Sequence, residues 1–301
     1  MKNYQGKTAV ITGAGSGFGL EVARIAATRG MNLVLCDVQS DALEKAAAEF
    51  DGHPVLARRV DVSKAAEMEA LAAAVQQRFG APHFVFNNAG VGSGGLVWEN
   101  TVADWEWVLG VNVMGVVHGV RLFTPMMLAA AEADPGYEGY IVNTASMAGM
   151  LNAPNMGIYN VSKHAVVALS ETLYQDLSLV TQQIHCSVLC PFFVPTGIAQ
   201  SHRNRPAEAA DAKPSKPTKA QLISQAMSDK AVSSGKLTAA DVAAMVFAAS
   251  DAGQFYVFSH PKSLAGVQTR MEDVMQLRNP TDPFKDRPEL GVQLRAALKA
   301  V

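Results

Sequence analysis

The 301-residue chain contains few cysteines and no excess of basic residues. Lys and Arg number 25 and Asp and Glu number 27, for a formal net charge of −2. The electrostatic attraction that drives nucleic-acid binding is therefore missing, and we expect no nucleic-acid partner. Cys36, Cys186 and Cys190 lie in apolar, strand-like runs without paired spacing, which argues against a disulfide framework and for a reducing cytoplasm. The seven histidines show no spacing suited to zinc, so we expect no metal.

Signals for membrane insertion and export are also missing. No uninterrupted apolar run reaches the roughly 18 residues of a transmembrane helix, and residues 1–7 lack the apolar core and cleavage site of a signal peptide. We therefore expect a cytoplasmic protein with no membrane partner. The composition, 49% hydrophobic and 17% charged, is that of a globular chain with a large core.

Short apolar runs alternate with helical patterns along most of the chain. This alternation predicts βαβ units and an α/β fold, a doubly wound, Rossmann-like parallel sheet in three α/β/α layers forming a single domain. A ligand cleft is then expected at the carboxyl ends of the strands. The expected strands are residues 8–11, 33–35, 55–60, 83–86, 140–144, 184–189 and 255–258. The expected helices are 19–29, 41–50, 65–78, a long one from about 102, 159–180, one after 238, and a weak one at 290–299. Thr101 and Asp104 are expected to form a capping box at the start of the long helix.

The segment 201–218 interrupts this pattern. It is rich in proline and charged residues and cannot build a core alone, so we interpret it as part of a lid at about residues 195–235. The lid belongs to a catalytic domain spanning residues 1–260. Residues 261–301 are mostly polar and are expected to form a C-terminal extension packed on the same domain.

A glycine-rich segment follows the first expected strand and opens the first expected helix. Residues 12–19 are Thr-Gly-Ala-Gly-Ser-Gly-Phe-Gly, a TGxxxGxG variant of the common GxGxxG pattern. Glycines let the backbone turn tightly and approach a pyrophosphate, whose charge meets the helix N-terminus. A glycine run alone also fits a simple tight turn, but its position between strand and helix favours dinucleotide binding.

Asp37 ends the second expected strand, 18 residues beyond Gly19. A carboxylate there can accept both ribose hydroxyls of NAD and would repel the additional phosphate of NADP. The residues around it offer no cation to offset that phosphate, so we expect NAD and regard NADP as the weaker candidate. The alternative is an ordinary turn or helix-capping aspartate.

A tyrosine, a lysine and a serine form the third pattern. Tyr159 and Lys163 are four residues apart and would share one helix face, while Ser146 follows an expected strand. A free tyrosine has a pKa of about 10 and is a poor base at neutral pH. We expect the Lys163 ammonium to lower that pKa and Ser146 to hydrogen-bond the reacting oxygen. A lone tyrosine–lysine pair is also common on solvated helix faces.

Together and in this order, the patterns resemble the classical short-chain dehydrogenase/reductase family over about residues 5–200. Residues 87–90, Asn-Asn-Ala-Gly, resemble its NNAG motif, and Asn112, Ser146, Tyr159 and Lys163 match its catalytic tetrad. The resemblance implies an NAD(H)-dependent enzyme that interconverts a secondary alcohol and a ketone, with Tyr159 as general acid and base. It implies that Asn112 holds a water in a proton relay; the alternative is a buried core asparagine.

The resemblance also implies the residues that bind cofactor and substrate. The cofactor set is Gly13, Ser16, Gly17, Phe18, Gly19, Asp37, Asp61, Val62, Asn88, Ala89, Gly90, Tyr159, Lys163, Pro191, Val194 and Thr196. The substrate set is Ser146, Met147, Leu151, Phe192 and Phe193, with residues 92–96, Met150, Ile198, Leu222, Ile223 and Met227 as further candidates for the wall. These mostly apolar side chains suit a bulky hydrophobic alcohol or ketone, although core packing explains any one of them equally well.

Two positions depart from the family pattern. Phe192 follows Pro191 where the family usually has glycine, and glycine accepts backbone conformations that phenylalanine does not. The residues Ser259-His260-Pro261 differ from the family's usual ending. Asp61 is a further open point, because it could cap the following helix instead of contacting adenine.

Two other functions fit parts of the pattern. One is a non-catalytic NAD(H)-binding or redox-sensing protein, which would need neither Ser146 nor Asn112. The other is an S-adenosylmethionine-dependent methyltransferase, in which Tyr159 and Lys163 would have no purpose. The resemblance further implies a homodimer or homotetramer.

Overall fold

The computed structural model describes residues 1–205 and 216–299. A seven-stranded parallel sheet forms its centre, with the strand order β3-β2-β1-β4-β5-β6-β7. The strands are β1 (Thr8–Thr12), β2 (Asn32–Asp37), β3 (Val55–Arg59), β4 (Phe84–Asn87), β5 (Gly139–Thr144), β6 (Ile184–Cys190) and β7 (Tyr256–Phe258). The order reverses between β1 and β4, so the predicted doubly wound α/β fold in a single domain is confirmed.

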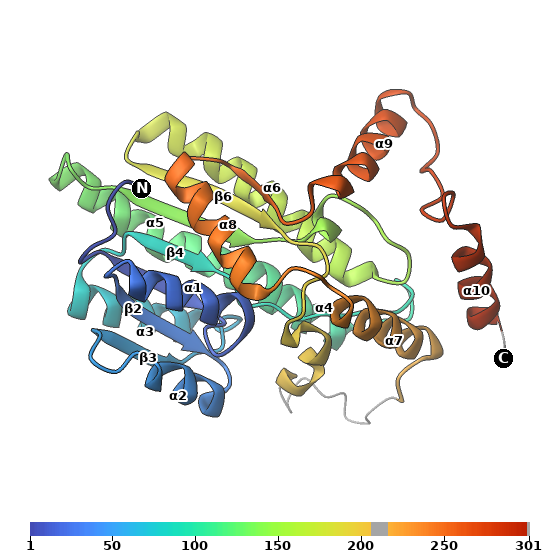
Figure 1. Cartoon of the computed structure of the whole chain (residues 1–301), viewed down its shortest axis with the longest axis horizontal. Helices are drawn as coiled ribbons and strands as arrows, with labels where there is room; N and C mark the ends of the chain where they lie inside the picture. Colours follow the sequence, from blue (N-terminus) through green and yellow to red (C-terminus); the bar gives the residue numbers. More distant parts are fainter. Residues whose placement is uncertain (206–215, 300–301) are drawn as a thin grey trace.

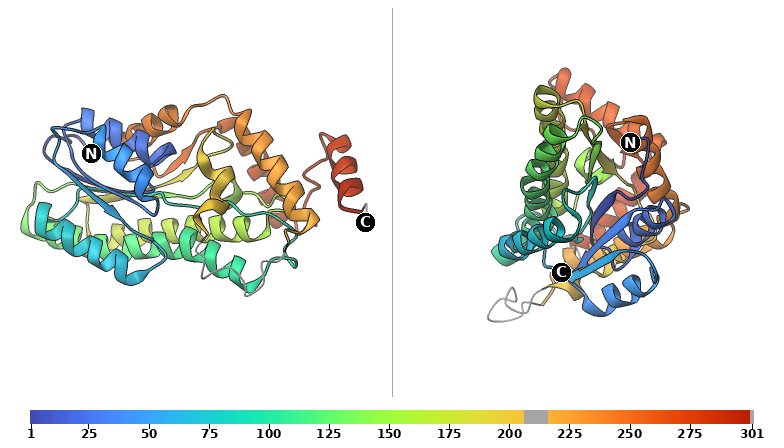
Figure 2. Two further views of the ribbon diagram at one scale, coloured as in Figure 1. Left: turned by 90° about the horizontal axis from the view of Figure 1, so that it is seen from below. Right: turned by 90° about the vertical axis from the view of Figure 1, so that its left-hand side faces the viewer.

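Helices cover both faces of the sheet (Figures 1 and 2). One face carries α1 (Gly17–Thr28), α2 (Ser40–Ala48) and α8 (Ala239–Ala252). The other carries α3 (Ala65–Phe79), α5 (Gly115–Ala133) and α6 (Gly157–Val180). Alternate strand residues enter the two cores: Ala9 and Ile11 pack on the first side and Val10 on the second, as the period of two in a strand requires.

The long helix expected from about residue 102 is divided by a π-helical turn. It consists of α4 (Val102–Leu109), the π turn η1 (Gly110–Met114) and α5. The predicted capping box is present, since Thr101 accepts from the Asp104 backbone N–H while Asp104 accepts from the Thr101 N–H. In η1 the Gly115 N–H donates to the Gly110 carbonyl, five residues back, and such turns are common at functional sites.

By length and composition alone, the helix Val102–Ala133 could cross a membrane. In this fold its inner side chains, including Val116, Phe123 and Met127, are buried in the cores against the sheet. The absence of an uninterrupted apolar run therefore did not by itself exclude a helix of this kind, because scattered polar residues do not prevent a high mean hydropathy.

The remaining elements lie beyond the carboxyl edge of the sheet. They are the short helical turns η2 (Met147–Gly149), η3 (Gly197–Asn204) and η5 (Pro261–Ser263), and the helices α7 (Lys219–Ser233), α9 (Leu264–Met275) and α10 (Pro288–Lys299). The expected lid contains η3 and α7, and its residues 206–215 lie outside the described residues. Helix α9 was not predicted, although Leu264, Val267, Met271 and Val274 recur at helical spacing.

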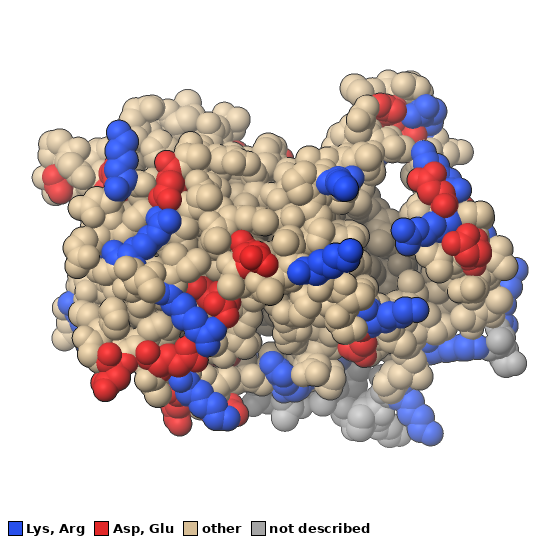
Figure 3. Space-filling model, viewed as in Figure 1, with Lys and Arg blue, Asp and Glu red and all other residues tan. Residues whose placement is uncertain are grey.

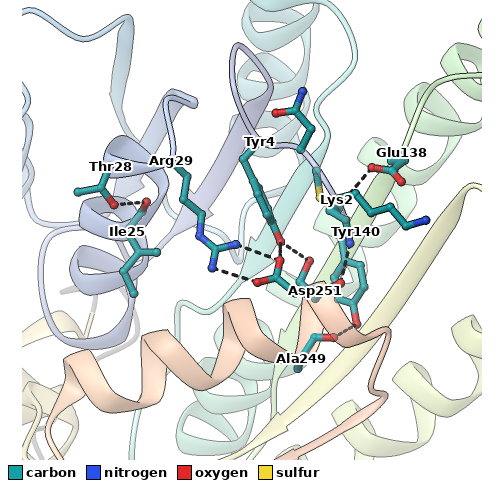
Figure 4. A network of polar contacts seen from close by, with 12 residues as sticks. Lys2, Tyr4, Ile25, Thr28, Arg29, Glu138, Tyr140, Ala249 and Asp251 are labelled. Carbon is teal, nitrogen blue, oxygen red and sulfur yellow. Dashed lines mark hydrogen bonds and ion pairs between the residues drawn. The ribbon is translucent and has the colours of Figure 1, made fainter.

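Three side chains tie the segment before β1 and the end of α1 to the end of α8 (Figure 4). The Tyr4 hydroxyl donates to Asp251 at 2.6 Å, and both Arg29 terminal nitrogens donate to the same carboxylate at 3.0 Å. The Arg29 guanidinium also lies 4.5 Å from the centre of the Tyr4 ring and 4.6 Å from that of Phe247. This Tyr4–Arg29–Asp251 cluster joins segments far apart in sequence.

Candidate functional site

A cleft of about 1370 Å³ opens at the carboxyl ends of the strands. Its floor is formed by the turns that follow β1, β4, β5 and β6, which is where ligands bind in open parallel sheets. One side is closed by α7 and by the segment from α9 to α10. All four residues matched to the catalytic tetrad lie at or beside this cleft, and three of them line it: Ser146, Tyr159 and Lys163.

The glycine loop joins β1 to α1 in a conformation that side chains would not permit. Gly13 and Gly17 have φ values of +67° and +55°, in the left-handed region. A Cβ atom on Gly19 would lie 2.1 Å from the Gly13 carbonyl oxygen. Ser16, the N-cap residue of α1, makes no side-chain capping bond, so the first N–H groups of the helix stay available to an anion.

Asp37 reaches this loop from the end of β2. Its Oδ2 accepts the Gly15 N–H at 3.0 Å and its Oδ1 accepts the Gln39 N–H at 3.0 Å. Two backbone donors therefore fix the carboxylate in the cleft wall. Asp61 and Val62 line the same region, and Asp61 also closes the turn before α3 by accepting from the Ser63 N–H and hydroxyl.

Thr12, which was not predicted as a site residue, joins the ends of β1 and β4 through hydrogen bonds. Its hydroxyl oxygen accepts the backbone N–H groups of Asn88 at 2.8 Å and Ala89 at 3.0 Å. The Asn88 side chain returns a bond to the Thr12 carbonyl at 3.0 Å. These bonds hold the Asn-Asn-Ala-Gly segment beside the glycine loop, at the point where the strand order reverses.

Asn112 lies in the π turn η1 and is completely buried. Its Oδ1 accepts the Val91 N–H at 2.8 Å, and its Nδ2 donates to the Val91 carbonyl at 3.0 Å and to the Ser162 hydroxyl at 3.1 Å. Its side chain therefore holds the segment after β4 against α6. Asn112 is not one of the described residues that line the cleft.

Ser146, Tyr159 and Lys163 meet where β5 ends and α6 begins. Ser146 caps the turn η2, accepting the Ala148 N–H at 3.1 Å. The Lys163 Nζ donates to the Thr144 carbonyl at 2.9 Å and lies 5.7 Å from the centre of the Tyr159 ring. The spacing of four residues does place tyrosine and lysine on one helix face, as the sequence indicates.

The expected lowering of the Tyr159 pKa by Lys163 is not what the structure shows. Burial raises the pKa of Tyr159, and a side-chain hydrogen bond with Ser146 opposes that rise. Burial also lowers the pKa of Lys163, to about 8. Desolvation is the largest cause of both pKa shifts, and it disfavours the charged form of each side chain.

The backbone at Phe192 is compatible with a side chain, because its φ does not lie in the left-handed region. The Phe192 N–H donates to the Ser259 hydroxyl at 2.9 Å, and its ring packs edge-on against Phe193 and His260. Ser259 and His260, which depart from the family pattern, therefore hold the backbone and the ring of Phe192, which also departs from it. Phe192 itself is 42% exposed and lines the cleft.

Most of the residues expected to form the substrate wall line the cleft. Met147, Leu151, Phe192, Phe193, Ile198 and Met227 line the cleft, as do Pro191, Val194 and Thr196. Met147 and Val194 are almost fully buried, so the cores hold most of their side chains. Five candidates do not line it: Gly95, Leu96, Met150, Leu222 and Ile223.

The C-terminal segment, which was predicted only as an extension packed on the same domain, forms one wall of the cleft. We call residues 261–299 the arm; its cleft-lining residues include Gly266, Arg270, Asp273 and Phe284. Figure 3 shows the hollow between the body and the arm, with Lys and Arg atoms along its rim. The signal that could have revealed this wall is the helical spacing of apolar residues in α9.

Comparisons with known proteins agree with this geometry. A family model described as short chain dehydrogenase matches residues 7–207. The "CLA biosynthesis dehydrogenase/reductase" of Lactiplantibacillus plantarum is 32% identical over 281 residues, covering 91% of this chain and 95% of that protein. A short chain dehydrogenase/reductase from Burkholderia phymatum, solved in complex with NAD, is 51% identical with a TM-score of 0.90 and covers 94% of this chain and 99% of its own. An alcohol dehydrogenase from the archaeon Thermococcus sibiricus, complexed with 5-hydroxy-NADP, is 26% identical with a TM-score of 0.67, over 84% and 96% of the two chains.

Proposed function

Because the chain belongs to the short-chain dehydrogenase family, we propose that it is an NAD(H)-dependent enzyme that interconverts a secondary alcohol and a ketone. The observation that carries the proposal is the placement of Ser146, Tyr159 and Lys163 in the same cleft as the glycine loop. A protein that only binds a dinucleotide would need the loop but not a serine, tyrosine and lysine around a common point.

The glycine loop and Asp37 fit the two halves of NAD. The free N–H groups at the start of α1 suit the pyrophosphate, and the close approach at Gly13 and Gly19 suits its contact with backbone. The Asp37 carboxylate, fixed by two N–H donors, suits the ribose hydroxyls and opposes a 2′-phosphate. Relatives hold both NAD and an NADP derivative, and Asp37 is the reason to propose NAD here.

In this mechanism, side chains of the protein transfer the proton of the substrate oxygen and position that oxygen. Bound NAD(H) supplies the hydride acceptor or donor. Tyr159 transfers the proton to or from the substrate oxygen, and Ser146 hydrogen-bonds that oxygen. Lys163 holds its ammonium beside the tyrosine ring and is placed to bind the nicotinamide ribose. Asn112 fixes Val91 and η1 and so shapes the turn beside Lys163.

The raised pKa of Tyr159 favours its neutral form at neutral pH. The hydroxyl is then ready to act as an acid in ketone reduction, whereas alcohol oxidation requires its proton to be removed first. The apolar wall of Leu151, Phe192, Phe193 and Ile198 suits a bulky hydrophobic alcohol or ketone.

We also propose that the protein forms a homodimer or homotetramer and is located in the cytoplasm.

The test is NADH formation from a panel of aliphatic, aryl and polycyclic secondary alcohols at mildly alkaline pH. We expect turnover by the native enzyme and its loss in Tyr159→Phe, with the affinity for NADH retained because only one hydroxyl is removed. Unchanged turnover in Tyr159→Phe would refute the role of this tyrosine. NADH binding without any turnover would favour a sensing function, and absence of NADH binding would overturn the cofactor.

A further inference from the structure

Helix α9 of the arm packs directly on the substrate wall. A Cβ atom on Gly266 would lie 3.4 and 3.5 Å from the two terminal carbons of Leu151, so the helix backbone is in contact range of that side chain. Leu151 lies five residues after Ser146 and lines the cleft. The face of α9 that carries Gly266 is therefore part of the substrate region.

Arg270 lies on the same face of α9, four residues after Gly266 and about 6 Å further along the helix axis. It lines the cleft and is partly buried. Within residues 1–205 and 216–299 the structure gives its side chain no ion pair and no hydrogen bond. A guanidinium in a cleft with no carboxylate partner of its own can bind an anionic group of a ligand.

The two acidic residues of α9 are already engaged. Glu272 accepts from the Gln268 side-chain amide at 2.8 Å. Asp273 accepts the Thr281 N–H at 2.9 Å and pairs with Arg278 at 3.0 Å. Both carboxylates of α9 therefore have other partners, and neither of them pairs with Arg270.

Other cations of the cleft are engaged or exposed. Arg205 pairs with Asp104 and lies 5.7 Å from the Trp107 ring, and Arg203 donates to Gln200 at 3.1 Å. His202 and Lys285 are exposed, so water screens their charge. Arg270 is thus the best-placed of these groups to bind an anion within the cleft.

We propose that the substrate carries a carboxylate at the end remote from its carbinol or carbonyl carbon, and that Arg270 binds this carboxylate. The proposal rests on the proposed function and adds the substrate class. The reacting oxygen lies at Ser146 and Tyr159, the apolar chain runs along Leu151 and the surface of α9, and the carboxylate meets the guanidinium. Arginine presents two parallel N–H donors that match a carboxylate.

The kinetic test compares a homologous series of hydroxy acids, each with a secondary alcohol at its penultimate carbon, with the corresponding primary amides. We expect kcat/KM to be at least tenfold higher for the acid than for the amide at the preferred chain length. Arg270→Gln should lower kcat/KM for the acids at least tenfold, mainly through KM, and Arg270→Lys should retain part of the preference. Arg287→Gln is the matched control, because Arg287 is an exposed arm residue that does not line the cleft.

Three results would overturn the proposal: equal use of acid and amide by the native enzyme, a preference that persists in Arg270→Gln, or an equal loss in Arg287→Gln. A binding measurement decides the matter even if no panel member is turned over. Calorimetric titration with decanoate and with decan-1-ol, with and without NAD, should show at least tenfold tighter binding of decanoate, lost in Arg270→Gln. Equal binding of the two probes would refute the carboxylate site, whereas selective binding without turnover would refute only the alcohol chemistry.

Discussion

Replacing Asn112 by alanine should destabilise the protein strongly, whatever it does to catalysis. The side chain is completely buried and pairs both the N–H and the carbonyl of Val91, a residue that is 3% exposed. Asn112→Ala leaves these two backbone groups without partners and removes one bond from Ser162. A buried unsatisfied group costs about 1–3 kcal/mol, and alanine regains only a few tenths through helix propensity.

The expected loss is therefore about 2–5 kcal/mol in the free energy of unfolding. A change of 1 kcal/mol shifts Tm by roughly 2–4 °C in proteins approaching this size, so Tm should fall by roughly 4–20 °C. The measurement is thermal unfolding by circular dichroism at a fixed scan rate without added cofactor. Asn152→Ala is the control, because Asn152 is exposed and should tolerate the change within about 0.5 kcal/mol.

A Tm within about 2 °C of the native value would refute this reasoning. It would mean that water or a local shift satisfies Val91 at little cost. A large loss of activity together with native Tm would instead assign Asn112 a role in the reaction that its side-chain contacts do not suggest.

Three further predictions concern the cofactor loop and the tyrosine. Asp37→Ala should lower kcat/KM for NAD about 10- to 100-fold, the value of one charge-assisted bond, and should narrow the preference over NADP; an unchanged cofactor ratio in initial-rate assays would contradict the role of Asp37. Gly19→Ala should weaken NADH binding at least tenfold in a fluorescence titration, because its Cβ would lie 2.1 Å from a backbone oxygen and the loop must move; native affinity would show that the loop is not the binding element. Since burial raises the pKa of Tyr159, kcat for alcohol oxidation should rise with pH through the alkaline range while ketone reduction at saturating substrate is sustained at neutral pH; a flat oxidation profile would exclude this tyrosine as the base.

The sequence alone predicted those features of the fold and the site that local patterns determine. The alternation of apolar runs predicted the parallel sheet, and the capping box at Thr101 and Asp104 predicted the start of α4. The spacing of Tyr159 and Lys163 predicted that both would reach one cleft, because helix geometry alone fixes that relation. The glycine loop was predictable for the same reason, since its position between β1 and α1 carries the signal.

The remaining features depend on contacts between distant residues. The hydrogen bonds between Asn112 and Val91 and between Phe192 and Ser259 join segments far apart in the sequence. No periodic pattern in the sequence predicts either bond. The direction of the Tyr159 pKa shift depends on how deeply the ring is buried, and the sequence motif does not specify that burial. The arm was predicted only as a C-terminal extension, because α9 has few apolar residues. Its role as a wall of the cleft follows from its position over Leu151.

The Tyr4–Arg29–Asp251 cluster has a consequence for the order in which the protein matures during synthesis. Every residue of the catalytic tetrad precedes Asp251 in the chain, so a nascent chain that ends after β6 has the chemistry but not this anchor. The segment before β1 and the end of α1 become fixed to each other through α8 only when α8 has emerged. The glycine loop lies between those two anchored points, so the earliest part of the chain to be made is held in its final position by one of the later ones.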